Sequence, residues 1–328
     1  MTAKKMNSLQ AVNSALAQAM AEDDKVLVLG EDVADREGGG VTGATAGLST
    51  RFGDDRVKST PISEQAIIGA AIGAALAGYK PVAEIMLMNF TTVAMDMIFN
   101  HAAKLRFMSG GQSTVPITIR TLTGAGWQTA GQHADHLEGW FAHTAGIKVV
   151  APSTPADYKG LLLSCIQDPD PCIFIESAGS LFIPGEVDEV ATPIPLGKAR
   201  IVQEGSDVTI VSWSSQLLRC QAALPALAEA GISVELVDLR TVSPWDREAV
   251  LASVAKTGRA LVVHEAVRDF GPGGEIASTI AEELFGQLKA PVRRLGAPKS
   301  PVPFAKVLED AYIVSPERVA DAVKALMA

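Results

Sequence analysis

The chain has 328 residues and a formal net charge of −9, and 48% of its residues are hydrophobic while only 5% are aromatic. This length suits two domains, and this apolar content can fill two large cores and excludes a disordered chain. The negative charge disfavours a general binder of nucleic acid or of anionic membranes, and no apolar run reaches the roughly 18 residues of a membrane-spanning helix.

The first elements along the chain favour a sheet covered by helices. Residues 1–24 have no signal-peptide core, and their apolar residues recur at the spacing of an amphipathic helix. Short apolar segments then predict buried strands at residues 25–30, 81–86, 115–122, 147–153 and 171–176. Helical patterns separate most of these strands, at residues 65–78, 91–108, 134–144 and 155–167. This alternation is typical of a parallel sheet with helices on both faces.

A change in composition separates a second unit. Residues 178–200 contain three prolines and several acidic residues with little periodicity, which predicts a linker. The alternation then restarts, with strands at 207–214, 233–240, 259–266 and 291–296 and helices at 215–230, 245–255, 274–288 and 315–327. We therefore expect an α/β protein with two doubly wound domains, at residues 1–190 and 191–328.

The segment STPISEQAIIGAAIGAALAG, residues 59–78, contains a single charged residue, Glu64. Ser63 can cap the helix that follows and places Glu64 in its first turn, where the helix dipole favours a carboxylate. Gly69 and Gly73 leave one helix face without side chains, so another backbone can approach it closely. On spacing alone, the glutamate serves either a buried structural helix or a cofactor pocket.

The same segment resembles the pyrimidine-binding signature of thiamin-diphosphate enzymes, Glu-x4-Gly-Φ-x-x-Gly. Further matches follow in chain order, in TPISE, EIMLMNF, GQHADHLEGWFAH, EGSDVTIVSW, VDLRTVSPWD and TGRALVVHEA. Together they resemble the beta subunit of the decarboxylating component of 2-oxo acid dehydrogenase complexes, a group that includes the pyruvate, branched-chain 2-oxo acid and acetoin dehydrogenases. The resemblance implies an N-terminal thiamin-diphosphate pyrimidine-binding domain and a C-terminal transketolase-like domain.

The resemblance also implies roles for particular residues. Glu64 would hydrogen-bond the pyrimidine ring and promote the imino tautomer with which the cofactor deprotonates its own thiazolium carbon. Phe90 would pack against the pyrimidine, although ordinary core packing is the alternative. His133 would assist acyl transfer to a lipoyl group, a proton-transfer task that suits imidazole near neutral pH. His133 and His136 with Asp135 also suggest a metal site, but this spacing lacks a third obvious ligand.

The chain lacks the Gly-Asp-Gly motif with which the family binds diphosphate and a divalent cation. We therefore expect a partner alpha subunit to hold the diphosphate and Mg²⁺, in an α2β2 heterotetramer in which helix 64–78 forms a subunit contact. A lipoyl-bearing acyltransferase is the second partner that the resemblance implies. It also implies a monovalent cation such as K⁺, bound by the backbone carbonyls of Ile117, Cys165, Asp168 and Asp170.

The expected function is that of a catalytic beta subunit, active only with an alpha subunit, in the oxidative decarboxylation of a 2-oxo acid or the cleavage of acetoin. Residues 38–48 resemble acetoin and branched-chain members, but departures from the family text around Ser59 and Ala134 and after Glu176 leave the acyl substrate open. A non-catalytic electron-transfer or scaffold subunit is the alternative. The odd number of cysteines, without Cys-x-x-Cys spacing, favours a reduced cytoplasmic protein.

Overall fold

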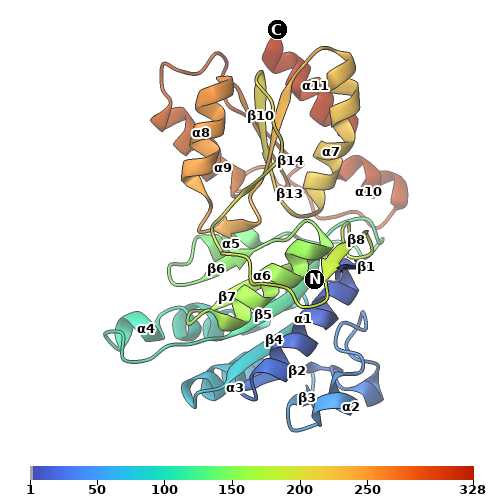
Figure 1. The fold of residues 1–328 in the computed structure, drawn as a ribbon, viewed down its shortest axis with the longest axis vertical. Helices are drawn as coiled ribbons and strands as arrows, with labels where there is room; N and C mark the ends of the chain where they lie inside the picture. Colours follow the sequence, from blue (N-terminus) through green and yellow to red (C-terminus); the bar gives the residue numbers. More distant parts are fainter. Residues whose placement is uncertain (1–2) are drawn as a thin grey trace.

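A seven-stranded sheet organises the first half of the chain and a five-stranded sheet organises the second half in the computed structural model, which describes residues 3–328 (Figure 1). Helices cover both faces of each sheet, so the predicted α/β class with two doubly wound units is confirmed. Across the described residues, no helix combines the length and apolarity needed to cross a bilayer.

The first sheet has the strand order β12-β6-β7-β5-β4-β2-β3, and all its neighbours pair in parallel except β12 and β6. Its parallel strands are β2 (Val26–Glu31), β3 (Val57–Thr60), β4 (Lys80–Leu87), β5 (Thr118–Thr123), β6 (Lys148–Val150) and β7 (Cys172–Ser177). The predicted buried strands are all present. The sequence analysis missed β3, which has only four residues, of which one is buried.

Helices α1 (Ser8–Glu22) and α6 (Pro155–Gln167) cover one face of this sheet, and α3 (Glu64–Leu76) covers the other. Strand β7 shows the alternation that requires two covers, because Cys172 and Phe174 pack with the α1 and α6 side while Ile173 and Ile175 pack with the α3 side. Every residue of β7 is buried, which explains why the strand appears in the sequence as a continuous apolar run.

The second sheet has the order β14-β13-β10-β11-β9, with only β9 antiparallel to its neighbour. Its strands are β9 (Arg200–Gln203), β10 (Val208–Ser212), β11 (Val234–Asp238), β13 (Ala260–Val267) and β14 (Arg293–Ala297). Figure 1 shows helices on its two sides, namely α7 (Ser214–Glu229) and α11 (Pro316–Met327) on one and α8 (Arg247–Thr257) and α9 (Gly273–Glu283) on the other.

The N-terminal segment and the expected linker differ from the prediction. Helix α1 begins only after strand β1 (Ala3–Asn7), because Asn7 and Gln10 form a reciprocal capping box at its start. Strand β1 pairs antiparallel with β8 (Pro184–Asp188), so the segment predicted as an irregular linker contains a strand. The first two residues of the expected helix lie outside the described residues.

The helix expected at residues 91–108 is wrong as a single element. The chain forms a 3₁₀ helix η2 (Met88–Ala94), a π-helical turn η3 (Met97–Ala102) and a short helix α4 (Leu105–Met108) instead. The helix expected at 134–144 is reduced to α5 (Glu138–Ala142), because Asp135, before it, is hydrogen-bonded to Asn89 in η2. Short elements were missed as well, namely η1 (Asp35–Glu37), α2 (Leu48–Phe52) and α10 (Lys306–Tyr312).

Two features join the halves of the chain. Strand β12 (Thr241–Ser243) follows β11 of the second sheet but pairs antiparallel with β6 at the edge of the first sheet. A single apolar cluster also runs from Ile67 in α3, through Phe141 in α5, to Ile276 in α9. The division into residues 1–190 and 191–328 therefore stays a prediction. Strand β12 lies in the second of these ranges, although it belongs to the first sheet.

Candidate active site

The three residues expected to act at the cofactor follow the carboxyl ends of parallel strands. Glu64 comes after β3, Phe90 after β4 and His133 after β5. In the order β5-β4-β2-β3, three strand spacings separate β5 from β3, or about 14 Å at about 4.8 Å per spacing. This edge of a parallel sheet is where open α/β folds bind ligands.

Glu64 is the first residue of α3 and is partly exposed. The preceding Ser63 does not cap the helix as expected, because its backbone (φ −168°, ψ 68°) leaves the hydroxyl without a capping hydrogen bond. Among residues 3–328, no hydrogen bond or ion pair engages the Glu64 carboxylate. Burial raises the pKa of the neighbouring Glu31, and the charges of Asp32 and Glu64 raise it further. Glu64 is thus free to bind a group that lies outside this chain.

The small face of α3 is open. The helix packs on the sheet through buried residues, namely Ile67, Ile68, Ala71, Ile72 and Ala75. On the other side Gly73 is exposed, and a Cβ built there meets no atom within 4 Å. A Cβ at Gly69 would meet only the Met97 Sδ, at 3.7 Å. The bare face expected from the sequence is therefore available to a close partner.

Phe90 and His133 lie in contact, with ring centroids 5.6 Å apart and planes at 71° in an edge-to-face arrangement. Phe90 is half-buried and packs against the apolar core, and its contact with a cofactor stays a prediction. His133 is half-buried and lines an open cavity of about 800 Å³ between the 129–135 segment and residues 299–301 of the second half.

The segment around His133 is fastened by Asn89, the residue next to Phe90. The Asn89 amide donates to the Gly131 carbonyl at 3.2 Å and to Asp135 Oδ2 at 2.8 Å, and it accepts from the Asp135 N–H at 3.2 Å. Asp135 is therefore used for structure. Within the described residues, no three histidine, cysteine, aspartate or glutamate side chains converge as a metal site.

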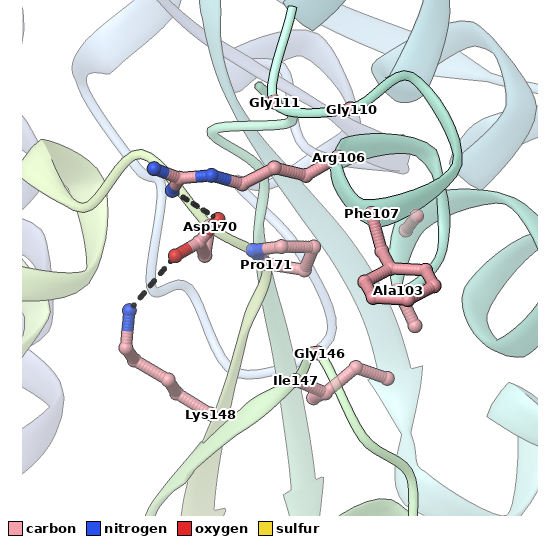
Figure 2. Close-up of a pocket in the computed structure, with 11 residues that line it drawn as sticks. Ala103, Arg106, Phe107, Gly110, Gly111, Gly146, Ile147, Lys148, Asp170 and Pro171 are labelled. Carbon is pink, nitrogen blue, oxygen red and sulfur yellow. Dashed lines mark hydrogen bonds and ion pairs between the residues drawn. The ribbon is translucent and has the colours of Figure 1, made fainter. Parts of the chain in front are cut away.

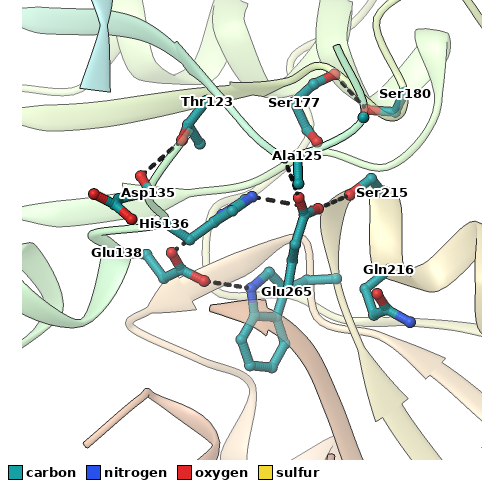
Figure 3. Close-up of polar contacts among 12 residues, drawn as sticks. Thr123, Ala125, Asp135, His136, Glu138, Ser177, Ser180, Ser215, Gln216 and Glu265 are labelled. Atoms are coloured by element: carbon teal, nitrogen blue, oxygen red, sulfur yellow. Dashed lines mark hydrogen bonds and ion pairs between the residues drawn. The ribbon is translucent and has the colours of Figure 1, made fainter. Parts of the chain in front are cut away.

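His136, three residues after His133, lies in a buried ion cluster between the two halves (Figure 3). Its Nδ1 is 3.3 Å from Glu138 Oε2 and its Nε2 is 3.3 Å from Glu265 Oε2. Burial opposes charge here, but the Glu265 and Glu138 charges raise the pKa of His136 well above its ordinary value. Burial likewise opposes ionisation of Glu265, yet the His136 charge and hydrogen bonds from Ser215 and Ala125 lower its pKa to about 2. The cluster is therefore an imidazolium held between two carboxylates.

The loop between β5 and His133 has an unusual backbone. Left-handed φ angles occur at every second residue, at Gly124 (112°), Gly126 (124°), Gln128 (56°) and Ala130 (63°). For the two residues that are not glycine this costs about 1–2 kcal/mol each. Such strain persists only where the surroundings fix it, and it is common at functional sites. The sequence did not predict this alternation.

Two buried carboxylates of the second half bind this loop, and the sequence analysis singled out neither. Glu265 of β13 accepts the Ala125 N–H at 2.8 Å, and Glu309 of α10 accepts the Gly126 N–H at 2.7 Å. Glu309 is fully buried. In the sequence it is one of two adjacent acidic residues in the short segment KVLEDAY, which is too weak a signal to identify a role.

The expected monovalent-cation ligands lie at the end of α6 and beside β5. The Ile117 carbonyl accepts the Cys172 N–H at 2.9 Å, and the Cys165 carbonyl accepts the Asp168 N–H at 3.3 Å. Figure 2 shows the neighbouring Asp170 side chain between two cations, Arg106 at 2.7 Å and Lys148 at 3.5 Å. Each carbonyl retains a second lone pair, so the cation site stays a prediction. The cysteines of this region, like Cys220, are buried and free.

Comparison with family models matches both halves of the chain. Residues 4–182 match the pyrimidine-binding domain of transketolase, and residues 197–319 match the transketolase C-terminal domain. A solved structure described as a split-gene transketolase, an inactive beta4 tetramer, superposes with a TM-score of 0.80 over 98% of both chains at 21% identity. At this identity the likeness concerns the fold alone.

Curated relatives are similar over almost the whole length. The beta subunit of acetoin:2,6-dichlorophenolindophenol oxidoreductase from Cupriavidus necator is 45% identical over 99% of this chain and 98% of its own. The beta subunit of the pyruvate dehydrogenase E1 component from Acholeplasma laidlawii is 43% identical over 97% of both chains. The mitochondrial 2-oxoisovalerate dehydrogenase beta subunit from Chaetomium thermophilum is 46% identical over 92% of this chain and 65% of its own. These relatives favour a catalytic subunit over a scaffold or electron-transfer subunit.

Proposed function

Since this chain belongs to the family of beta subunits of thiamin-diphosphate-dependent 2-oxo acid and acetoin dehydrogenases, we propose that it forms the pyrimidine-binding half of an active site completed by an alpha subunit. The observation that carries the proposal is the edge of the first sheet. There a glutamate whose carboxylate has no hydrogen bond or ion pair among residues 3–328 follows β3, and a contacting phenylalanine–histidine pair follows β4 and β5.

The residues present fit the pyrimidine end of the cofactor. Glu64 offers a carboxyl group for a ring nitrogen, and half-buried Phe90, which follows β4, offers an apolar ring. When bound, thiamin diphosphate supplies a nucleophilic carbon and an electron sink for breaking a bond next to a carbonyl. Glu64 would hold the proton at the pyrimidine nitrogen that favours the imino tautomer. His133 would move a proton during acyl transfer, which is a task that suits an imidazole.

The proposed reaction with a 2-oxo acid breaks the bond between its carbonyl carbon and its carboxylate, and CO₂ leaves. The carbonyl carbon is oxidised to an acyl group, and the two electrons reduce the lipoyl disulfide. One lipoyl sulfur takes the acyl group and the other takes a proton to become a thiol. With acetoin, the bond between its two oxygen-bearing carbons breaks and acetaldehyde leaves in place of CO₂. The lipoyl group belongs to an acyltransferase partner.

The alpha subunit would hold the diphosphate and Mg²⁺, because this sequence has no Gly-Asp-Gly motif. We propose an α2β2 assembly in which the open face of α3 contacts another subunit. A K⁺ ion on the carbonyls of Ile117, Cys165, Asp168 and Asp170 would brace the end of α6. A cytoplasmic location agrees with the three free cysteines.

Co-expression with the alpha subunit tests the proposal. The purified complex is assayed with pyruvate, branched-chain 2-oxo acids and acetoin, each with 2,6-dichlorophenolindophenol as the electron acceptor. We expect one substrate class to dominate and the activity to depend on added thiamin diphosphate and Mg²⁺. Activity that survives Glu64→Ala in full would contradict a catalytic subunit and favour the scaffold alternative.

A further inference from the structure

The alternating backbone of the 124–130 loop makes a binding site for an anion. Turns that contain residues with positive φ can direct successive N–H groups into one concavity that binds an anion. Here the concavity faces Glu309, whose Oε1 accepts the Gly126 N–H at 2.7 Å and the Gln128 N–H at 3.1 Å. The anion that fills this site is thus a side chain of the same molecule.

Glu309 reaches the loop from the second half of the chain. It lies in α10 and is fully buried, so its carboxylate has no access to water in place of the two N–H groups. A second tie lies beside it, because Glu265 accepts the Ala125 N–H at 2.8 Å and a hydrogen bond from the Ser215 hydroxyl (Figure 3). The two carboxylates hold consecutive turns of the loop.

The far end of the loop carries His133 and is held by the first half of the chain. Asn89 binds the carbonyl of Gly131 and the side chain of Asp135, on either side of His133. Between these anchors Ala130 keeps a left-handed φ of 63°. A loop that is fixed at both ends and strained between them has one shape, and that shape places the His133 ring 5.6 Å from Phe90.

We propose that Glu309 is a positioning residue for His133: its buried carboxylate holds the loop in the shape that presents the imidazole to the acyl group. The proposal rests on the role assigned to His133 in the proposed function. It makes the second half of the chain, which also lines the cavity beside His133, a participant in acyl transfer. Removal of the carboxylate leaves the Gly126 and Gln128 N–H groups unpaired, and the loop can then relax.

The test uses the assembled alpha–beta holoenzyme and the ratio of two rates, with lipoyl acceptor and with 2,6-dichlorophenolindophenol. His133→Ala should lower this ratio, because only the lipoyl rate requires acyl transfer. Glu309→Ala should lower it by about 10- to 100-fold, the scale of a misplaced catalytic group. The double variant should show no lower ratio than His133→Ala alone. Glu309→Gln retains a carbonyl oxygen that can accept both N–H groups, so it should restore most of the ratio.

A matched control is Asp246→Ala. Asp246 is also a buried carboxylate of the second half that accepts two backbone N–H groups, from Ala199 at 3.0 Å and from Ala249 at 3.2 Å, but it lies away from the loop. Its loss should lower stability without a change in the ratio. Hydrogen–deuterium exchange of the peptide that spans 124–137 should accelerate in Glu309→Ala and stay unchanged in the control.

The possible results distinguish a failure of the Glu309 positioning role from a failure of the proposed function. If His133→Ala lowers the ratio and Glu309→Ala does not, the positioning role is wrong and the proposed function stands. If His133→Ala leaves the ratio unchanged, the role of His133 fails and the positioning role fails with it. Unchanged loop exchange in Glu309→Ala also overturns the inference. If that variant does not assemble, Glu309→Asp replaces it, since the shorter side chain withdraws the acceptor that Glu309→Gln keeps.

Discussion

Glu64 and His133 lie at the same edge of the first sheet, but their surroundings differ. Among residues 3–328 no hydrogen bond or ion pair holds the Glu64 carboxylate, and the small face of its helix is exposed. The loop of His133 is fixed by Asn89 at one end and by Glu265 and Glu309 at the other. One end of the site is therefore left for other molecules to complete, and the other is built by the chain itself.

Because of this difference, Glu64 and His133 should respond to different changes in the molecule. The environment of Glu64 is decided by what docks on α3 and by the cofactor, so it should respond to assembly. The orientation of His133 is decided by hydrogen bonds across the two halves of the chain, so it should respond to changes in the second half. A variant that affects both ends equally would remove the distinction.

The largest expected effect is on subunit assembly, through the exposed small face of α3. Among residues 3–328, no atom outside the adjacent turns of its own helix lies within 4 Å of the Cβ position at Gly73, so Gly73→Leu should retain the fold. The added side chain should prevent the close approach of a partner, and the tetramer and essentially all activity should be lost. Light scattering of the co-expressed subunits measures this. Leu76→Ala, on an exposed position of the same helix, is the control that shortens a side chain. A normal Gly73→Leu tetramer would show that this face is not an interface.

The next largest expected effect concerns Glu64, the proposed acid at the start of α3. Glu64→Gln keeps the shape of the side chain but cannot act as the acid, and activity in every assay should fall by about 10²–10⁴-fold. Exchange of the cofactor's thiazolium proton for deuterium, followed by NMR, should slow as well. His133→Ala should leave this exchange largely intact. An equal loss of exchange in both variants would show that His133 also takes part in activating the cofactor, and that the two residues do not have separate roles.

The smallest expected effect is a pH dependence of the free energy of unfolding, and it arises from the ion cluster near His133. The pKa of Glu265 is about 2 in the folded chain against an ordinary 4.5, a difference worth about 3 kcal/mol at about 1.4 kcal/mol per unit. Because the folded value is the lower one, this stability is present above pH 4.5 and is lost as the pH falls towards 2. Urea unfolding across this range measures it. His136→Gln should weaken the pH dependence of the free energy of unfolding, whereas exposed His101→Gln should not. An equal pH dependence in the two variants would show that the ion cluster does not cause it.

The buried strands were the part of the fold that the sequence predicted best. Buried parallel strands are continuous apolar runs, so β4 and β7 were visible directly. Glu64, Phe90 and His133 came from the family resemblance, and the structure brings the last two into contact. Their roles stay predictions.

The supports of the loop could not be predicted. Glu309 lies 183 residues from Gly126 along the chain, and no local pattern connects them. His136 attracted only a weak metal interpretation, because its partner Glu265 is supplied by β13. The irregular turns at residues 88–102 also arise from packing rather than from propensity, since the sequence there has a helical pattern.

Strand β12 has a consequence for the order in which the protein is made. It is the outer strand of the first sheet, yet it lies at Thr241–Ser243, beyond β9, β10 and β11 of the second sheet. While the ribosome is still synthesising the segments before it, the edge of β6 has no neighbour. An unpaired strand edge is a template for pairing with other chains. The edge of β6 thus stays unpaired until residues 241–243 have emerged, after three strands of the second sheet.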